Sequence, residues 1–240
     1  MRRLAVWSGP RNISTALMRS WENRPDTVVV DEPLYAHFLA VSGRDDPGRD
    51  EVLAAGETDW RRVVAGLLGP APDGVAVSYQ KQMAHQLTDE IGRGWLHRLT
   101  NVLLIRDPAE VVASYVRSRP EVATADIGLD QQVRLYDELA ARGGPPPVID
   151  AADFLRDPES YLRRLCELVG VAFDSAMLSW PPGRRETDGV WGRYWYDAVW
   201  ASTGFEPYRP RDVRLSGRAA EVAAACRPAY ERLHVLRWTP

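Results

Sequence analysis

Residues 1–21 read MRRLAVWSGPRNISTALMRSW. A short apolar run, residues 4–7, is followed by a loop over residues 8–15 and then by a stretch with helical spacing. This order predicts a buried strand, a tight turn and a helix that begins near Ser14. Such a unit is the usual start of an α/β fold, in which strands and helices alternate along the chain.

Further along, the same alternation continues to about residue 150. The predicted strands are the short apolar runs at residues 4–7, 27–31, 75–78, 101–105 and 147–149. The predicted helices cover residues 14–22, 60–68, 108–117, 131–141 and, later, 158–169. Runs without polar alternation are typical of parallel strands that are buried on both faces. The sequence therefore predicts an α/β three-layer sandwich with a mainly parallel sheet of about five strands, in a topology like that of P-loop NTPases.

The domain organisation follows from length and composition. The 240 residues predict a single domain, with a probable loop or insertion at residues 42–59 and an irregular and helical C-terminal part at residues 181–240. The net charge of -3 argues against a nucleic-acid partner. No apolar run reaches the roughly 20 residues of a membrane span, and no signal peptide precedes the first strand. With Cys166 and Cys226 read as free thiols, we expect a soluble cytoplasmic protein, either a monomer or a homodimer.

The loop at residues 8–15 has the features of an anion site. Backbone N–H groups at a helix start attract negative charge, Ser14 and Thr15 add hydroxyl donors, and Arg11 adds a fixed positive charge. A nucleotide-binding Walker loop needs Gly-Lys before the Ser/Thr, whereas Ile13 and Ser14 stand at those places. An ordinary strand–turn–helix with a Ser/Thr cap is the alternative.

Two other features bear on phosphate chemistry. Residues 28–32, VVVDE, resemble a Walker B strand, which keeps a kinase or NTPase that uses ATP and magnesium open as an alternative. Lys81 is the only lysine in the chain. Its survival reflects either a coding bias toward arginine or a need for a compact ammonium at this position.

Residues 102–115, VLLIRDPAEVVASY, have the pattern of a strand that is followed directly by a helix. Arg106 ends a strand, Pro108 starts a helix, and Ser114 follows eight residues after the arginine. With this segment and the first loop, the chain resembles the sulfotransferase family that uses 3′-phosphoadenosine 5′-phosphosulfate (PAPS). The resemblance covers residues 4 to about 180. The first loop is of the bacterial type and is closer to the G-x-P-R loop of the tyrosylprotein type than to the K-S-G-T-T loop of the cytosolic type.

The resemblance implies a set of cofactor-binding residues. Arg106 and Ser114 match the pair that binds the 3′-phosphate. Gly183-Arg184-Arg185 is the best substitute for the family's C-terminal loop over the cofactor. The residues that match the loop around the 5′-phosphosulfate are Gly9, Pro10, Arg11, Asn12, Ile13, Ser14 and Thr15. Ile13 replaces a loop glycine, and its Cβ alters how closely the backbone can approach the ligand.

The resemblance also implies catalytic roles. Arg11 matches the cation that neutralises the bridging oxygen as the sulfuryl group leaves, and Lys81 matches a residue at the sulfate end. Glu32 matches an acidic base that would take the acceptor proton. His37 is the rival base, with His85 a weaker one. The chemistry requires no metal, and PAP is the product.

The acceptor is left open by the sequence. Tyr35, Phe38 and the aromatic cluster at residues 191–200 are candidate walls for a small molecule that carries a hydroxyl or an amine. No membrane partner is expected. Besides a kinase or NTPase, a non-catalytic PAP- or nucleotide-binding protein of the same fold is an alternative.

Overall fold

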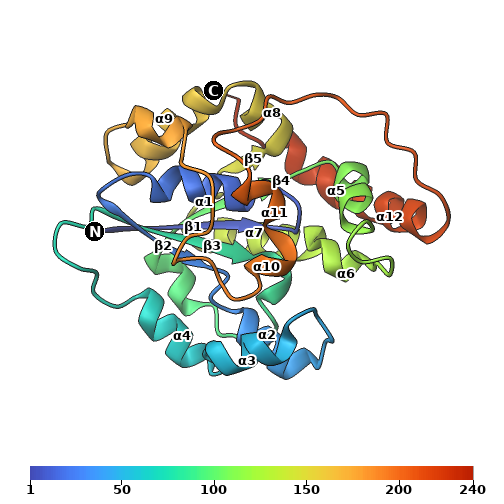
Figure 1. Ribbon diagram of the computed structural model, residues 1–240, viewed down its shortest axis with the longest axis horizontal. Helices are drawn as coiled ribbons and strands as arrows, with labels where there is room; N and C mark the ends of the chain where they lie inside the picture. Colours follow the sequence, from blue (N-terminus) through green and yellow to red (C-terminus); the bar gives the residue numbers. More distant parts are fainter. Residues whose placement is uncertain (240) are drawn as a thin grey trace.

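A parallel sheet forms the centre of the computed structural model, which describes residues 1–239 (Figure 1). Within these residues the sheet has five strands in the order β2-β3-β1-β4-β5, and every neighbouring pair is parallel. The strands are β1 (Arg2–Ser8), β2 (Thr27–Asp31), β3 (Val77–Met83), β4 (Thr100–Ile105) and β5 (Val148–Asp150). The predicted α/β fold with a parallel sheet is confirmed.

Helices connect the strands and cover both faces of the sheet. In the first 143 residues they are α1 (Ser14–Glu22), α2 (Tyr35–Ser42), α3 (Arg49–Ala55), α4 (Trp60–Leu67), α5 (Pro108–Tyr115), α6 (Thr124–Ile127) and α7 (Leu129–Gly143), with short 3₁₀ helices η1 (Ala84–Gln86) and η2 (Gly94–Arg98). The later ones are α8 (Ala151–Arg156), α9 (Pro158–Val169), η3 (Ser175–Leu178), α10 (Gly192–Trp195), α11 (Asp197–Trp200) and α12 (Gly217–Val235).

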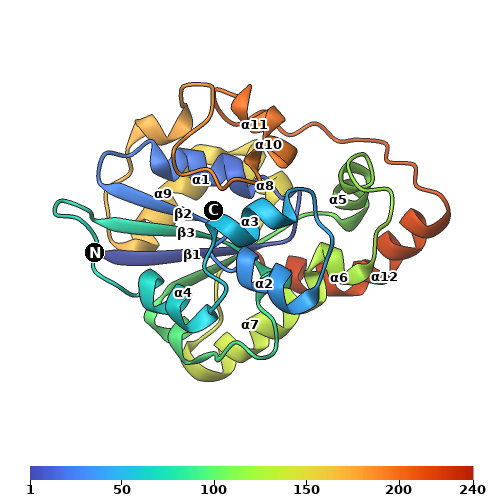
Figure 2. The same ribbon diagram turned by 60° about the horizontal axis from the view of Figure 1, so that its bottom comes forward.

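The alternation of side chains along β1 builds the two sides of the core. Leu4 and Val6 pack with α1 and α9, whereas Ala5 and Trp7 pack with α4, η2 and α7. Figure 2 shows α1 and α9 on one side of the sheet and α4 and α7 on the other. Because successive residues of a strand point to opposite faces, an all-apolar strand needs helices on both sides.

One strand lies at a different place from the one that the sequence predicts. β3 begins at Val77 and continues to Met83, so that Lys81 lies inside the strand and not after it. All seven residues are buried, because β3 pairs with β2 on one side and β1 on the other. Two of its polar side chains have partners elsewhere in the chain: Gln80 donates a hydrogen bond to the carbonyl of Leu67, and Lys81 donates to Asp31. The sequence gives no local sign of those partners.

The segment at residues 42–59 is not entirely a loop. Helix α3 occupies part of it, and Val52 of that helix packs against α2. The last sixty residues are irregular and helical, with two four-residue helices before the long α12. Across residues 1–239 we find no helix with the length and apolar character needed to span a membrane.

Candidate functional site

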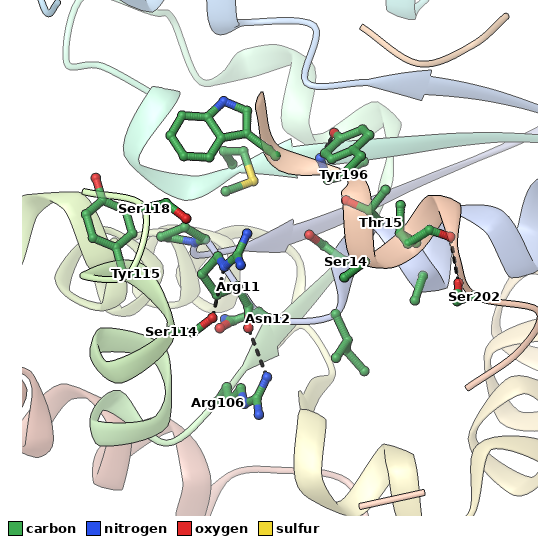
Figure 3. A pocket seen from close by; sticks show the side chains of 18 of the residues that line it. Arg11, Asn12, Ser14, Thr15, Arg106, Ser114, Tyr115, Ser118, Tyr196 and Ser202 are labelled. Carbon is green, nitrogen blue, oxygen red and sulfur yellow. Dashed lines mark hydrogen bonds between the residues drawn. The ribbon is translucent and has the colours of Figure 1, made fainter. Parts of the chain in front are cut away.

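A cavity of about 620 Å³ lies beyond the carboxyl ends of the strands, where open parallel sheets bind their ligands. Three stretches that are distant in sequence line most of it: residues 10–16, residues 106–126 and residues 195–211. Glu32, Lys81 and Gln86 add a fourth wall. Figure 3 shows residues of the first three stretches from close by, with Ser114 to the lower left of Arg11 and Tyr196 to its upper right.

Arginines gather at one end of the cavity. The Arg11 Nε donates a hydrogen bond of 3.0 Å to the Ser114 hydroxyl, and an Arg106 Nη donates one of 3.1 Å to the Arg11 carbonyl. Burial, together with the positive charges of Arg117 and Arg106, lowers the pKa of Arg11 from its ordinary value. Mutual repulsion of this kind favours an anion between the arginines, and planar guanidinium groups suit the oxygens of a phosphate.

Arg106 has an internal partner for its charge. It pairs with Glu110 one turn later at 2.7 Å, and the Tyr208 hydroxyl donates to the same carboxylate at 2.9 Å. Tyr208 belongs to the irregular segment 203–211, which lines the cavity. The arginine end is therefore joined through Glu110 to the C-terminal part of the chain.

The first loop turns sharply before α1 begins. Both Arg11 and Ile13 adopt the left-handed conformation, with φ of 59°. For a β-branched residue such as Ile13 this conformation is strained, and backbone strain of this kind is concentrated at functional sites. Ile13 is also the N-cap of α1, so the first N–H groups of the helix follow directly at Ser14 and Thr15.

Gly9 does not line the cavity. A Cβ on this residue would stand 2.2 Å from the Ile127 carbonyl oxygen at the end of α6. The glycine is therefore needed because the loop passes close to another backbone, which is a packing reason and not a ligand contact. Asn12, in turn, fixes the loop to the sheet by donating to the Leu104 carbonyl at 3.2 Å.

Two carboxylates and one lysine form a polar cluster at the other end of the cavity. The register pairs Asp31 of β2 with Lys81 of β3, and Glu32 follows with a strained φ of 40°. The ammonium of Lys81 lies 2.8 Å from Asp31 Oδ1 and 2.6 Å from Glu32 Oε1. It also donates to the Tyr196 hydroxyl at 2.7 Å, and Gln86 Nε2 donates to Glu32 Oε2 at 2.7 Å.

Burial and charge have opposite effects in this cluster. Burial alone would lower the pKa of Lys81, but the carboxylates of Asp31 and Glu32 raise it well above its ordinary value, so the ammonium stays charged. Burial raises the pKa of Asp31, although Lys81 counteracts this. Burial and the charge of Asp31 raise the pKa of Tyr196, which keeps its hydroxyl protonated.

A second polar network closes the side of the cavity near Glu32. Tyr35 donates to Asp46 at 2.8 Å, Arg44 donates to Asp46 at 2.8 Å, and Arg44 also contacts Asp126 and the Tyr115 hydroxyl. These contacts join the loop after α2 to the segment between α5 and α7. The wall that they form is more polar than the mostly apolar acceptor site that the sequence predicts.

Some residues that the sequence singles out lie away from the cavity. The His37 Nδ1 lies 2.7 Å from the Thr58 carbonyl, and its Nε2 lies 3.3 Å from Glu90, on the far side of α2. Arg184 stacks on the Trp200 ring at 4.3 Å, and Arg185 donates to the Pro181 carbonyl at 3.2 Å. Of the aromatic candidates, Tyr35, Trp195 and Tyr196 line the cavity, whereas Phe38 packs edge-on against His85.

Other residues enter the cavity without a clear signal in the sequence. Gln86 donates to Glu32, and Arg209 and Arg211 line the cavity from the irregular segment. The run YRPRDVR at residues 208–214 is the one signal that could have identified the two arginines in place of Arg184 and Arg185. Among residues 1–239, no group of three His, Cys, Asp or Glu side chains is placed to hold a metal ion.

A family model and two curated proteins match most of the chain. The family model described as a sulfotransferase domain matches residues 1–233. Two curated proteins of Arabidopsis thaliana are similar, the branched-chain-amino-acid aminotransferase-like proteins 1 and 2, with 39% identity over 212 residues and 33% over 234. These matches cover 88% and 97% of this chain but only 38% and 41% of the relatives, so the chain spans about two fifths of their length.

Solved structures share the fold at low sequence identity. The sulfotransferase domain of the Synechococcus PCC 7002 olefin synthase has a TM-score of 0.55 at 16% identity, over 94% of both chains. The sulfotransferase domain from the curacin biosynthetic pathway has a TM-score of 0.55 at 14% identity, over 99% of this chain and 98% of that one. A sulfotransferase from Alicyclobacillus acidocaldarius has a TM-score of 0.53 at 16% identity, over 100% and 97%.

Proposed function

The chain belongs to the sulfotransferase domain family, and from that premise we propose that it transfers a sulfuryl group from PAPS to a hydroxyl or amine of a small-molecule acceptor. The observation that carries this proposal is the convergence of Arg11, Arg106 and Ser114 at one end of the cavity. Positive charge and a hydroxyl at that point suit a phosphate. Glu32 at the other end suits the removal of a proton.

The donor would lie between these two ends. Arg106 and Ser114 bind the 3′-phosphate, and the left-handed loop with the start of α1 binds the 5′-phosphosulfate through N–H groups and the Ser14 and Thr15 hydroxyls. We place Arg209 and Arg211 over the 3′-phosphate in place of Arg184 and Arg185, because Arg209 and Arg211 line the cavity and the other two do not.

The reaction would be an in-line displacement at sulfur. A bond forms between the acceptor oxygen or nitrogen and sulfur, and the bond from sulfur to the bridging oxygen of PAPS breaks, which leaves PAP. Arg11 and the N–H groups at the helix start stabilise the charge that develops on the leaving phosphate. Glu32 receives the acceptor proton, and the cavity holds both reactants in line.

A thermal-shift titration with PAP tests the donor site. A ligand at about a hundred times its Kd stabilises a protein by roughly 2.7 kcal/mol, which raises Tm by about 5–10 °C for a chain of this size. We expect this shift without magnesium and its loss in Arg106→Ala. A shift only with magnesium-ATP would instead favour the kinase alternative.

Arg163→Ala is the matched control. Arg163 also pairs with a glutamate one turn away, at 2.6 Å from Glu159, but it lies on the outer surface of α9. We expect PAP to shift its Tm as in the wild type. An equal loss of the shift in both variants would mean that Arg106 acts on the fold and not on the ligand. Formation of PAP from PAPS separates an enzyme from a non-catalytic binding protein.

A further inference from the structure

The hydrogen-bonding capacity of Lys81 is fully used by the protein. An ammonium group has three N–H donors. Those of Lys81 point to Asp31 Oδ1 at 2.8 Å, Glu32 Oε1 at 2.6 Å and the Tyr196 hydroxyl at 2.7 Å. The side chain is only 2% exposed, so it cannot turn toward a ligand without leaving two buried carboxylates without their counter-ion. A sulfuryl oxygen would have to displace one of these partners.

Tyr196 completes the arrangement from the C-terminal part of the chain. Its hydroxyl accepts from Lys81 and donates to Asp31 Oδ2 at 2.7 Å, so the three groups form a closed ring of hydrogen bonds. The neighbouring Trp200 donates to Asp188 at 2.9 Å, and Asp188 forms an ion pair with the buried Arg19 of α1. The tyrosine is thus held in place by a helix of the central fold.

Glu32 is the member of this cluster that faces the cavity. It is 12% exposed on its side chain, and its two oxygens are held by Lys81 and by Gln86. A carboxylate that is gripped at both oxygens keeps one orientation, yet each oxygen retains a lone pair for a proton. Because Asp31 shares the ammonium, Lys81 does not fully neutralise Glu32.

We infer that Lys81 is a positioning residue that aims Glu32 at the acceptor and does not bind the sulfuryl oxygens, and that Tyr196 is its support. The inference rests on the proposed function, in which Glu32 takes the acceptor proton. It assigns a role in the reaction to Tyr196, which belongs to the C-terminal part of the chain. It also gives a physical reason why a compact ammonium stands at position 81, because the planar fork of an arginine could not meet three converging acceptors in this space.

The test compares Tyr196→Phe with Tyr194→Phe. Tyr194 lies two residues earlier, is 38% exposed and contacts Glu51 on the surface, so it is a matched control. For each variant, calorimetric titration measures the Kd of PAP and of PAPS, and a separate assay measures the rate of PAP formation from PAPS with water as the acceptor. Lys81→Met is included, with circular dichroism to check that it folds.

If Lys81 and Tyr196 only position Glu32, their substitution should lower the rate of PAP formation and leave the affinity for PAP and PAPS unchanged. In Tyr196→Phe we expect PAP formation to fall about tenfold to a hundredfold, while the Kd values of both ligands stay within about twofold of the wild type. Tyr194→Phe should behave as the wild type. In the Glu32→Gln background, Tyr196→Phe should cause no further loss, because residues that act through one another are not additive.

Two results would overturn the inference. If Lys81→Met or Tyr196→Phe weakens PAPS but not PAP, Lys81 binds the sulfuryl group. If the losses from Tyr196→Phe and Glu32→Gln add, Tyr196 does not act through Glu32. A wild-type protein that binds neither PAP nor PAPS would contradict the proposed function itself, which is a distinct outcome.

Discussion

At the scale of single residues, Gly9 links the first loop to α6. Its missing side chain leaves room for the Ile127 carbonyl, which would stand 2.2 Å from a Cβ. We expect Gly9→Ala to lower the free energy of unfolding by about 1–3 kcal/mol, because backbone must move to relieve the overlap. Chemical denaturation measures this change. We also expect the variant to bind PAP more weakly, because Arg11 lies two residues later in the same loop.

Gly66→Ala is the control for Gly9→Ala. Gly66 lies inside α4, and an added Cβ meets no atom within 4 Å among the described residues. Alanine is the better helix former, so this substitution should stabilise the protein by about 0.5–1 kcal/mol. A Gly9→Ala protein as stable as the wild type would mean that the loop can move away from α6 at no cost.

His85 makes the stability of the protein depend on pH. Burial, and then the charge of Arg44, lowers the pKa of His85 from 6.5 to about 4. Between these two pH values the unfolded chain binds a proton that the folded chain does not, so the free energy of unfolding falls as the pH decreases. The shift corresponds to roughly 3 kcal/mol, which is fully lost below about pH 4.

Urea unfolding between pH 7 and pH 4 measures this dependence. His85→Gln should remove the histidine contribution, so that its stability falls less steeply than that of the wild type over this range. His97→Gln, which changes an exposed histidine of η2, should follow the wild-type curve. Parallel curves for wild type and His85→Gln would contradict a neutral His85 in the folded protein.

At the scale of elements, the C-terminal segment is attached to α1 through Asp188. Arg19 is 1% exposed and pairs with Asp188, which also accepts from the backbone N–H of Arg185 and from the indole of Trp200. Removal of one partner of a buried pair leaves a charge without compensation. Asp188→Ala should therefore cost about 3 kcal/mol of stability, whereas Asp197→Ala, at an exposed aspartate nearby, should change it by less than about 0.5 kcal/mol.

Tyr196 gives this prediction a functional readout. If α10 and α11 stay in place only through Asp188, the Asp188→Ala protein should also form PAP from PAPS more slowly, since Lys81 loses its support. Full stability in Asp188→Ala would show that Glu22 alone, at 2.9 Å, compensates Arg19.

The comparison of β1 and β3 explains how far the elements can be predicted from the sequence. β1, α1 and α9 are recognisable because their apolar residues follow the periods of a strand and of a helix. β3 contains Gln80, Lys81 and Gln82, so its polar letters read as a loop although all of them are buried. The partners of Gln80 and Lys81 lie 13 and 50 residues away, at Leu67 and Asp31, and only the tertiary structure brings them together.

The same limit applies to the site. Arg11 and Arg106 could be singled out because each follows a strand, and parallel strands bring such positions to one edge. Ser114, near the end of α5, could be singled out by its spacing of eight residues from Arg106. Tyr196 lies 115 residues from Lys81 in a segment without regular periodicity. His37 was a candidate because it is a histidine close to Glu32, and Arg184 because it resembles part of the family's C-terminal loop, but both side chains contact other groups.

At the scale of the whole molecule, the cavity joins segments that are far apart in the chain. Residues 10–15, 106–118 and 203–211 meet there, and the last of these lacks regular structure. Its last part, residues 206–211, is attached to the rest through Tyr208, whose hydroxyl donates to Glu110 and whose N–H donates to the Leu155 carbonyl. Backbone of this kind opens locally more easily than a core strand.

PAP should therefore stabilise all three segments together, which hydrogen exchange with mass spectrometry can measure. We expect slower exchange at residues 10–15, 106–118 and 203–211 when PAP is bound, because the ligand contacts each of these segments. Exchange in α9, which does not line the cavity, should change little. Arg106→Ala should abolish the effect at all three segments, since it removes the binding itself. Protection of residues 10–15 without residues 203–211 would mean that Arg209 and Arg211 do not contact the 3′-phosphate, and would leave that phosphate to Arg106 and Ser114 alone.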